Sequence, residues 1–486
     1  MVVQHNMQAA NANRMLGITS GAQAKSTEKL SSGYKINRAA DDAAGLTISE
    51  KMRKQIRGLD KASSNAQDGV SSVQTAEGAL TEVHSMLQRM NELAVQAANG
   101  TNSKDTDRKA IQDEIDQLNT EIDRVAETTK FNEIYLLKGD DGEKTVNMKA
   151  HDAGLKGTLT DNGDGTATFK MDTLNAGDTV SIGGKNYTIG GEAADVTDML
   201  TKAGITDAAG DKVTINGKEY TYCENASDGK TALTHKGYYE TAPDTANAAT
   251  ANPAYADSAA IAAAKSATIS VGTKSITTID DTKADGIDDN DTSVITKQKA
   301  YELAGKELLA ANQIGDTEGN AEVKNGDKTD LAYNAGDGTF NIKVGQAKVA
   351  NTLSFSLHVG ADADMTNKIT VDIETMNSAN LGIKGLNVTD KNGSAATYAI
   401  DAISDAISKV SSQRSALGAV QNRLEHTIDN LDNISENTSS AESRIRDTDM
   451  AKEMVNYSKN NILAQAGQSM LAQANQSNQG VLSLLQ

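Results

Sequence analysis

Six aspartates crowd into the twelve residues from 280 to 291, and they are the first candidates for chemistry in this chain of 486 residues. Carboxylate oxygens at short spacing suit Ca²⁺, which takes oxygen ligands. The run nevertheless lacks the ligand spacing of an EF-hand loop. We therefore interpret it as a solvated acidic loop and keep calcium binding as the alternative. The six residues are Asp280, Asp281, Asp285, Asp288, Asp289 and Asp291.

Motifs for catalysis or cofactor binding are incomplete elsewhere in the chain. The segment Gly229-Lys230-Thr231 ends like a phosphate-binding loop, but Glu224 stands where that motif needs its first glycine. The six histidines form no HExxH pair, and there is no GxSxG segment of a hydrolase nucleophile. Cys223 is the single cysteine, so an internal disulfide and a CxxC site are excluded. The sequence predicts no catalytic, cofactor or metal site, and we expect that the chain is not an enzyme.

The formal net charge of −19 narrows the range of partners. Nucleic acids and anionic membrane surfaces bind clustered Lys and Arg, so we expect neither as a partner. No apolar run approaches the roughly 20 residues of a membrane span. Residues 1–25 likewise lack the apolar stretch of about 7–15 residues of a signal peptide. If the chain is secreted, we expect a route without a cleaved leader.

The composition divides the chain into two ends and a middle. All eleven Arg lie outside residues 139–352, whereas both prolines lie inside them. The same middle holds 20 Lys against 33 Asp and Glu, so it carries most of the negative charge. Because the ends contain no proline, nothing there forces a helix to break. This shift indicates that the middle is inserted between two parts of one architecture.

Apolar residues recur about every 3.5 residues in both ends, which is the period of a coiled coil. One stripe runs from Met52 to Ala97 and another from Ile400 to Ile445. Because the stripes match in length and come from opposite ends, we expect them to pack together as a long antiparallel bundle. A shorter helix over Ile111–Val125 should pack beside them. The predicted fold class is mainly α, with a β-rich insertion.

The extreme tips, Asn6–Lys29 and Ala464–Gln479, are rich in Ala, Asn, Gln and Gly and poor in large apolar residues. Alone, they would bury too little surface to offset the entropy that is lost on ordering. We therefore predict that they are frayed in a single chain and become helical against neighbouring copies. The residues predicted to drive this self-assembly are apolar: Met454, Ile462, Met470, Leu471, Val481, Leu482 and Leu485.

The insertion contains an internal repeat with strand character. Gly177–Thr188 recurs 33 residues later as Gly210–Thr221, and each copy alternates β-branched residues around a Gly-Gly or Asn-Gly turn. Such turns predict β-hairpins. Further predicted elements are a looser hairpin over Thr268–Ile279, hairpin turns at Asp164-Gly165 and Asp337-Gly338, and short helices within 246–267 and 296–312.

Distinctive motifs occur in both ends of the chain, among them Leu30-Ser-Ser-Gly-Tyr-Lys-Ile-Asn37 and Gln88–Asn99 near the amino end and Ser415–Leu424 near the carboxyl end. Together they resemble the motifs of bacterial flagellins. The resemblance covers roughly residues 1–138 and 353–486, and several motifs together make it specific. The amino-terminal motifs are Leu30-Ser-Ser-Gly-Tyr-Lys-Ile-Asn37, Asp41-Asp-Ala-Ala-Gly-Leu46, Asn65-Ala-Gln-Asp-Gly-Val70 and Gln88–Asn99, and the carboxyl-terminal ones are Ser415–Leu424, Ser443–Asp449 and Gln465–Asn475.

The resemblance implies three layers in a filament. Residues 1–40 and 450–486 would form a terminal coiled-coil domain in the inner tube. Residues 41–138 and 353–449 would form a helical rod domain with a small β part in the outer tube. Residues 139–352 would be a variable insertion on the surface. The chain would then be an extracellular structural subunit that polymerises into the flagellar filament for motility and is exported without a cleaved signal peptide.

The resemblance also implies partners besides other copies of the chain. These are a secretion chaperone on the carboxyl-terminal helix, the filament cap and hook-junction proteins, and Toll-like receptor 5, which recognises the rod surface of some flagellins. Arg89, Leu93 and Gln96 share one helix face. Leu93 is then either an apolar anchor for the receptor or a core residue. The matching receptor-binding residues are Gln88, Arg89, Leu93, Gln96 and Glu114.

Two departures from the flagellin pattern lie at the tips. Met7–Ala24 holds few leucines, and the last residue is Gln486, where many relatives end in Arg. The nearest alternative function is a hook–filament junction protein, which shares the end architecture but would be expected to lack the match at Gln88–Asn99. An enzyme hosted in the insertion is a function of a different class. A chemoreceptor-like signalling coil is another, and it would need membrane spans.

Overall fold

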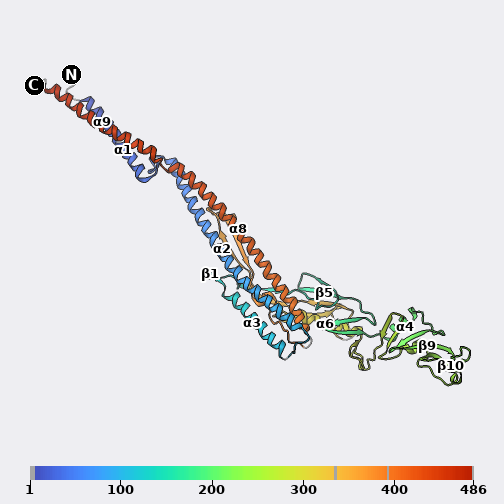
Figure 1. The fold of residues 1–486 in the computed structure, drawn as a ribbon. Helices are drawn as coiled ribbons and strands as arrows, with labels where there is room; N and C mark the ends of the chain where they lie inside the picture. Colours follow the sequence, from blue (N-terminus) through green and yellow to red (C-terminus); the bar gives the residue numbers. More distant parts are fainter. Residues whose placement is uncertain (1–5, 105, 333–335, 391–392, 484–486) are drawn as a thin grey trace. The chain divides into compact units, whose positions relative to one another are not determined.

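A computed structural model describes residues 6–104, 106–332, 336–390 and 393–483. The chain forms two compact units. One consists of Met1–Gln74, Phe355–Val371 and Gly418–Gln486, and the other of Thr75–Ser354 and Asp372–Leu417. The two longest helices, α2 (Ala43–Ala98) and α8 (Ser394–Arg446), each contribute residues to both units (Figure 1). The predicted fold class, mainly α with a β-rich insertion, is confirmed.

The tip of the first unit is an antiparallel helix pair, α1 (Met7–Ser32) and α9 (Met450–Ser483), which run alongside each other in Figure 1. Helix α1 begins where the Asn6 side chain accepts a hydrogen bond from Ala9 N–H, and it ends at Gly33, whose φ of 76° is left-handed. Asn6 Nδ2 also donates to the Ala474 carbonyl at 3.1 Å, which ties the start of α1 to α9.

The prediction that the tips become helical only against neighbouring copies is wrong for this structure. Both tips are continuous helices, and each supplies the other with a neighbour along its length. The tips were expected to lack a partner within one chain, but α1 and α9 are partners of each other. The pairing covers little apolar surface, however, because Ser26 is the only buried residue in the whole described span of α1.

Further along the first unit, α2 and α8 are antiparallel neighbours. Ser49 Oγ donates to Glu442 at 2.6 Å, and Ser63 Oγ donates to Asp432 at 3.0 Å, so the partner number falls as the residue number rises. A two-stranded sheet, β17 (Leu353–His358) and β18 (Lys368–Ile373), completes this part of the core. The sheet packs against the two helices through one buried cluster, which consists of Ala66 of α2, Leu424 of α8, Ile369 of β18 and Val359.

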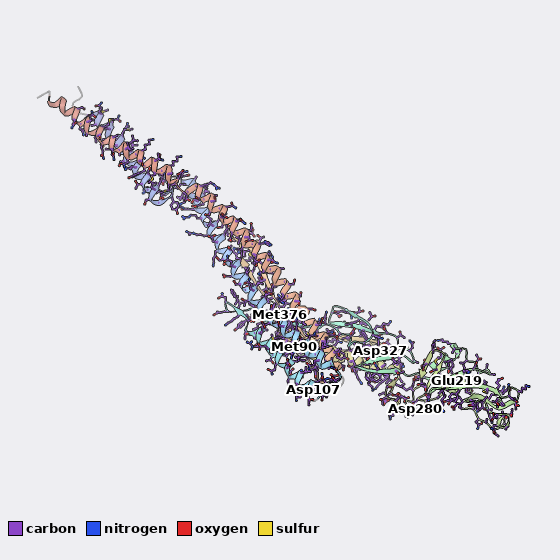
Figure 2. All side chains as sticks on the ribbon, in the orientation of Figure 1. Met90, Asp107, Glu219, Asp280, Asp327 and Met376 are labelled. Atoms are coloured by element: carbon purple, nitrogen blue, oxygen red, sulfur yellow. The ribbon has the colours of Figure 1, made fainter. Side chains whose placement is uncertain are left out.

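The helical part of the second unit combines α3 (Asp107–Thr128) with residues 75–98 of α2 and 394–417 of α8. The predicted stripes form its core: Leu80, Leu87 and Met90 of α2 are fully buried, as are Ile403 and Val410 of α8. Ile111, Ile115 and Ile122 are the buried face of α3, which confirms the predicted third helix. Met90, Asp107 and Met376 mark this region in Figure 2.

Arg108 fixes the turn between α2 and α3. Its side chain is fully buried, and its guanidinium donates to the carbonyls of Ala97 at 2.8 Å, Asn99 at 3.3 Å and Asp390 at 2.8 Å. A cation at the carboxyl end of a helix satisfies carbonyls that have no partner within the helix and suits the negative end of its dipole.

The remainder of the second unit is mostly β. Strand β3 (Asp140–Asn147) pairs antiparallel with β16 (Gln346–Asn351), so the two ends of the inserted segment meet in one ladder. A four-stranded sheet follows the order β14-β15-β5-β4, a three-stranded one β13-β7-β6 and a five-stranded one β10-β9-β8-β11-β12. The bounds are β4 (Gly157–Asp161), β5 (Thr166–Met171), β6 (Thr179–Ile182), β7 (Lys185–Ile189), β8 (Lys212–Ile215), β9 (Lys218–Asn225), β10 (Ala232–Tyr239), β11 (Thr268–Val271), β12 (Lys274–Thr277), β13 (Val294–Ile295), β14 (Glu322–Asn325) and β15 (Thr339–Lys343).

These sheets enclose two separate hydrophobic cores. One surrounds Phe169, Phe340 and Leu308 and includes helix α6 (Lys297–Asn312). The other surrounds Ile269, Tyr238 and Val196 and includes α4 (Ala193–Lys202) and α5 (Ser258–Ala262). Smaller elements are β1 (Lys130–Phe131), β2 (Ile134–Tyr135), α7 (Ser378–Leu381), η1 (Thr245–Asn247) and η2 (Met365–Asn367).

The internal repeat is the same hairpin built twice. Thr179 pairs with Thr188 in the first copy, and Lys212 pairs with Thr221 in the second. The second pairing has the same register as the first, one repeat length further along the chain. Both turns have two residues with positive φ, Gly183-Gly184 and Asn216-Gly217. The predicted hairpins at Thr268–Ile279 and at Asp164 are confirmed as well.

The predicted hairpin turn at Asp337-Gly338 is wrong. Strand β15 starts just after it, but its partner β14 ends at Asn325, so the connection runs over residues 326–338. The Asp337 carboxylate instead accepts a hydrogen bond from Thr339 N–H at 2.8 Å, which closes a local turn just before β15.

Candidate functional site

The acidic segment 280–291 satisfies its carboxylates with its own chain. Asp288 is buried and accepts hydrogen bonds from Ser266 Oγ and from backbone N–H groups, including that of Asp280 at 2.6 Å. The backbone N–H of Gly286 donates to Asp281 at 2.8 Å, and Lys283 forms an ion pair with Asp289. The hydrogen bonds from Lys283 and Thr282 lower the pKa of Asp289 to about 2. These oxygens act as caps of a folded loop (Asp280 is labelled in Figure 2).

No group of three or more His, Cys, Asp or Glu side chains is arranged to hold a metal ion in the described parts of the chain. The backbone N–H groups around Lys230, which a phosphate would need, are also already hydrogen-bonded to the chain itself. The Asp228 carboxylate accepts hydrogen bonds from the N–H groups of Lys230 and Thr231, each at 2.9 Å, in the turn between β9 and β10. An anion would have to displace that carboxylate, so the geometry does not suit phosphate.

The predicted assembly residues other than Leu485 lie on α9, and most of their described side chains are exposed although they are apolar. Met454 is 63% exposed, Ile462 67% and Met470 66%. Leu471 is half-buried. Val481 and Leu482 belong to α9, but their side chains are not described, and Leu485 lies outside the described residues.

Other exposed apolar residues of α9 were not among the predicted assembly residues. Val455 and Leu463 are also exposed, so α9 carries the adjacent pairs Met454-Val455 and Ile462-Leu463, with Met470-Leu471 completing the series. The pairs recur every eight residues, and eight residues advance a helix by about 80° beyond two full turns. Successive pairs therefore face different directions. The eight-residue spacing was readable in the sequence. Apolar side chains of α1 that are exposed in the same way are Met7, Met15 and Ile18.

Four of the five predicted receptor residues gather on the surface of the second unit. Gln88, Arg89 and Gln96 of α2 and Glu114 of α3 are exposed. Arg89 forms ion pairs with Glu114 at 2.8 Å and with Glu92 at 3.2 Å. Its hydrogen bonds to Glu114 and then to Glu92 raise the pKa of Arg89. The pair therefore fixes a charged patch across two neighbouring helices.

Leu93 does not share that exposure. It is 2% exposed, and the adjacent Ala94 is fully buried, so both belong to the core stripe. Of the two roles open to Leu93, the structure favours the core, because the helix turns both residues inward beneath the patch. A partner that touches this surface meets Arg89 and Glu114 first.

Comparison with known proteins gives this arrangement its context. The family model of the bacterial flagellin N-terminal helical region matches residues 3–141, and that of the C-terminal helical region matches residues 400–485. The flagellin of Clostridium tyrobutyricum is 39% identical over 484 residues, covering 99% of this chain and all of that one. The chain belongs to the bacterial flagellin family. Its role is therefore that of a structural subunit of the flagellar filament, which forms by polymerisation.

Other flagellins are similar over the whole length. The flagellin of Bacillus subtilis (strain 168) is 34% identical and covers 100% of both chains, and polar flagellin A of Vibrio parahaemolyticus is 34% identical over 99% of both. Within the described residues of this flagellin, no helix combines the length and apolarity needed to cross a membrane.

Two of the flagellin motifs also contact each other, near the end of α1 and the end of α8. The sequence alone assigned no role to these residues. Arg446 of the carboxyl-terminal motif lies over the Tyr34 ring at 4.8 Å, and its carbonyl accepts a hydrogen bond from Lys35 N–H at 2.6 Å. Thr448 N–H donates to the Gly33 carbonyl at 2.9 Å. These contacts fasten the turn after α1 to the connection between α8 and α9. The signal was the presence of Tyr34 and Arg446 in motifs from opposite ends of the chain.

Proposed function

We propose that this flagellin polymerises through α1 and α9, which neighbouring copies surround in the filament core. The observation that carries the proposal is the exposure of apolar pairs on successive faces of α9. A helix that is apolar on several faces has to be covered from several sides. Within one chain, α1 lies beside α9, so other copies are the natural cover for the faces that α1 leaves open.

The layered organisation extends this proposal. Residues 1–40 and 450–486 form the inner tube, residues 41–138 and 353–449 the rod domain of the outer tube, and residues 139–352 the exposed insertion. The strong negative charge of the insertion supports its place at the surface, because it keeps the polymer soluble.

Seeded growth of filaments tests the assembly surface. Ile462→Gln combined with Met470→Gln removes two apolar side chains without adding charge. We expect this variant to remain monomeric with seeds that elongate the wild type, and to unfold in the same range as the wild-type monomer. The matched control is Gln468→Asn with Gln473→Asn on the same exposed helix, which should elongate normally. Elongation of the Ile462/Met470 variant at the wild-type rate would refute the proposal.

The same experiment separates the alternative of a hook–filament junction protein. A filament subunit adds to its own ends without limit, whereas a junction protein is present in a small number of copies. Long filaments that contain only this chain therefore favour the filament subunit. We infer likewise that its role is structural rather than catalytic, and catalytic turnover by purified filaments would contradict that inference.

We further propose that Toll-like receptor 5 recognises the monomer at the Arg89–Glu114 patch, with Gln88 and Gln96 at its edge. An exposed arginine already held by carboxylates on two sides presents a fixed donor geometry to a partner. Leu93 supports the patch from below, because it is buried. Truncating it would act through the shape of the surface.

Receptor affinity of two matched arginine variants tests this proposal. We expect Arg89→Asp to weaken binding about tenfold or more, as for an interface hot spot. Arg124→Asp is the control, because Arg124 of α3 is also exposed and pairs with Glu121. Equal affinity of the Arg89→Asp variant and the wild type would remove the patch from the receptor interface.

Export and assembly helpers complete the proposed function. The chain leaves the cell through the flagellar channel without a cleaved signal peptide, a secretion chaperone covers the carboxyl-terminal helix, and the cap and hook-junction proteins meet the filament ends. The exposed apolar side chains of α9 support a chaperone, since they need cover before assembly. Co-purification from the cytoplasm that is lost when residues 450–486 are deleted tests this partner.

A further inference from the structure

The Lys409 side chain of α8 donates two hydrogen bonds to one residue, Asn380. Its Nζ donates to the backbone carbonyl of Asn380 at 2.8 Å and to the side-chain Oδ1 of the same residue at 3.0 Å. Its side chain is 30% exposed. Burial, the largest influence, lowers the pKa of Lys409; the nearby charge of Glu374 raises it, and that of Lys144 lowers it. The amine is thereby shifted toward its neutral form, in which it is a nucleophile.

The carboxamide of Asn380 is equally constrained. Asn380 is 2% exposed, and its Nδ2 donates to the Thr375 carbonyl. Its backbone belongs to the short helix α7, whose start is fixed by hydrogen bonds from Ser378 to Asp123 of α3. Because backbone and side chain are both fixed, the carboxamide presents the same oxygen to Lys409. Its Cγ is one bond from that oxygen, so the reacting atoms are already close.

A carboxylate lies within reach of the same amine. Glu374 Oε2 is 4.0 Å from Lys409 Nζ, and the other oxygen of Glu374 is 3.9 Å from Lys144 Nζ. A carboxylate at this distance can take a proton from an attacking amine through one bridging water and pass it to a leaving group. Asn380 and Lys409 also line a cleft of about 300 Å³, which offers a small product a way out.

We propose that Lys409 and Asn380 join through an isopeptide bond once this part of the chain has folded. Neutral Lys409 Nζ attacks Asn380 Cγ, the new C–N bond forms, the bond from Cγ to Nδ2 breaks, and ammonia leaves. Glu374 carries one proton from the attacking nitrogen to the departing one. Nothing is oxidised or reduced, and no co-reactant is needed. The product would fasten α7 covalently to α8 and close the intervening chain into a loop.

The mass of the folded full-length chain tests the proposal. We expect the purified monomer, denatured after folding, to weigh about 17 Da less than its sequence mass because one ammonia is lost. Digestion should then yield a branched peptide that joins the segments containing Asn380 and Lys409. An internal succinimide at another asparagine also loses ammonia, so the branched peptide decides. Separate, unmodified peptides from a folded wild-type chain would overturn the proposal and leave Lys409 as a hydrogen-bonding cap of α7.

Three variants sharpen the result. Lys409→Arg keeps the positive charge and the donors but lacks the amine, so we expect the full mass. Glu374→Gln keeps the size of the side chain but cannot carry the proton, so the bond should form at least about tenfold more slowly. Lys149→Arg is the matched control, since Lys149 lines the same cleft and pairs with Asp405, and it should lose ammonia like the wild type. Loss of ammonia from the Lys409→Arg variant with an unchanged peptide map would contradict the assignment.

Discussion

The tip pair α1–α9 and the rod helices are both antiparallel helical assemblies, yet they bury different amounts of apolar surface. The rod helices are α3 with residues 75–98 of α2 and 394–417 of α8. In the rod, Leu80, Leu87 and Met90 are fully enclosed, and α3 adds a third apolar face. In the tip pair, Ser26 is the only buried residue along the described length of α1, and Met454, Ile462 and Met470 of α9 are exposed. Each rod side chain of this size contributes about 1.5–3 kcal/mol by burial, a contribution that the exposed tip side chains lack.

The difference shows that helical continuity and helical stability have separate origins in this flagellin. Ala and Gln favour helix locally, so the tips form helices without a large core. Stability comes from packing of an apolar face, which the rod has and the tip pair lacks. A subunit that has to join others benefits from this division, because the rod has its own buried core and the tips keep apolar side chains available.

The largest effect is expected in the rod core. Leu87→Ala should lower the free energy of unfolding of the monomer by about 2–5 kcal/mol, because the removed atoms leave a cavity in a packed core. Urea unfolding followed by circular dichroism measures the loss. Val95→Ala on the same helix is the control, since Val95 is exposed and should cost about 0.5 kcal/mol or less. Equal losses for the two variants would mean that the α2 stripe is not the core.

The next effect concerns the buried arginine between α2 and α3. Arg108→Met should destabilise the monomer by about 1–3 kcal/mol, because the carbonyls of Ala97, Asn99 and Asp390 lose a donor. Arg124→Met is the matched control on α3, where the exposed ion pair with Glu121 should contribute far less than the buried hydrogen bonds of Arg108. A stabilised Arg108→Met variant would show that the cost of burying the charge exceeds its hydrogen bonds.

A much smaller effect on the monomer is expected at the tip. Ile462→Ala should change the free energy of unfolding of the monomer by about 0.5 kcal/mol or less, because the exposed side chain loses little burial. The same urea titration serves for comparison with Leu87→Ala. A loss near that of the rod variant would mean that Ile462 is packed within the lone chain and would erase the contrast between the two regions.

The smallest effect is a pH dependence at the joint between α1 and α2. Hydrogen bonds from the N–H groups of Arg38 and Asn37 lower the pKa of Asp41. Because the folded pKa is lowered, this stabilisation is present above the unfolded pKa of about 4 and is lost as the pH falls through the folded value. Asp41→Asn should therefore differ from the wild type at about pH 7, and the difference should shrink as the pH falls below the unfolded pKa. A difference that stays constant across this range would contradict the assignment.

Periodic features of this flagellin were predictable from its sequence. The apolar stripes in α2 and α8 repeat over many helical turns. The buried face can therefore be identified even if a single position is assigned wrongly. The hairpins of the insertion were equally clear, because Gly183-Gly184 and Asn216-Gly217 need positive φ and leave few other turn types. Local chemistry decides such elements, and tertiary packing only places them.

Features that depend on distant partners were not predictable. The pairing of the helical tips brings together the two ends of the chain, and the burial of Leu93 depends on how α2 is rotated in its bundle. Composition and spacing specify neither. Arg108 and the Lys409–Asn380 contact are similar cases, since a single charged side chain carries no period. The partner of β15 was missed because β14 lies beyond a connection of many residues.

Hydrogen exchange of the backbone amides, compared between monomer and filament, tests most directly whether the tips gain their stability from neighbouring copies. We predict that amides of α1 and of residues 450–477 exchange quickly in the monomer and become strongly protected in the filament, whereas amides around Leu87 and Met90 are protected in both. Tip amides that are as protected in the monomer as in the filament would contradict this prediction, because the tips would then be stable without neighbouring copies.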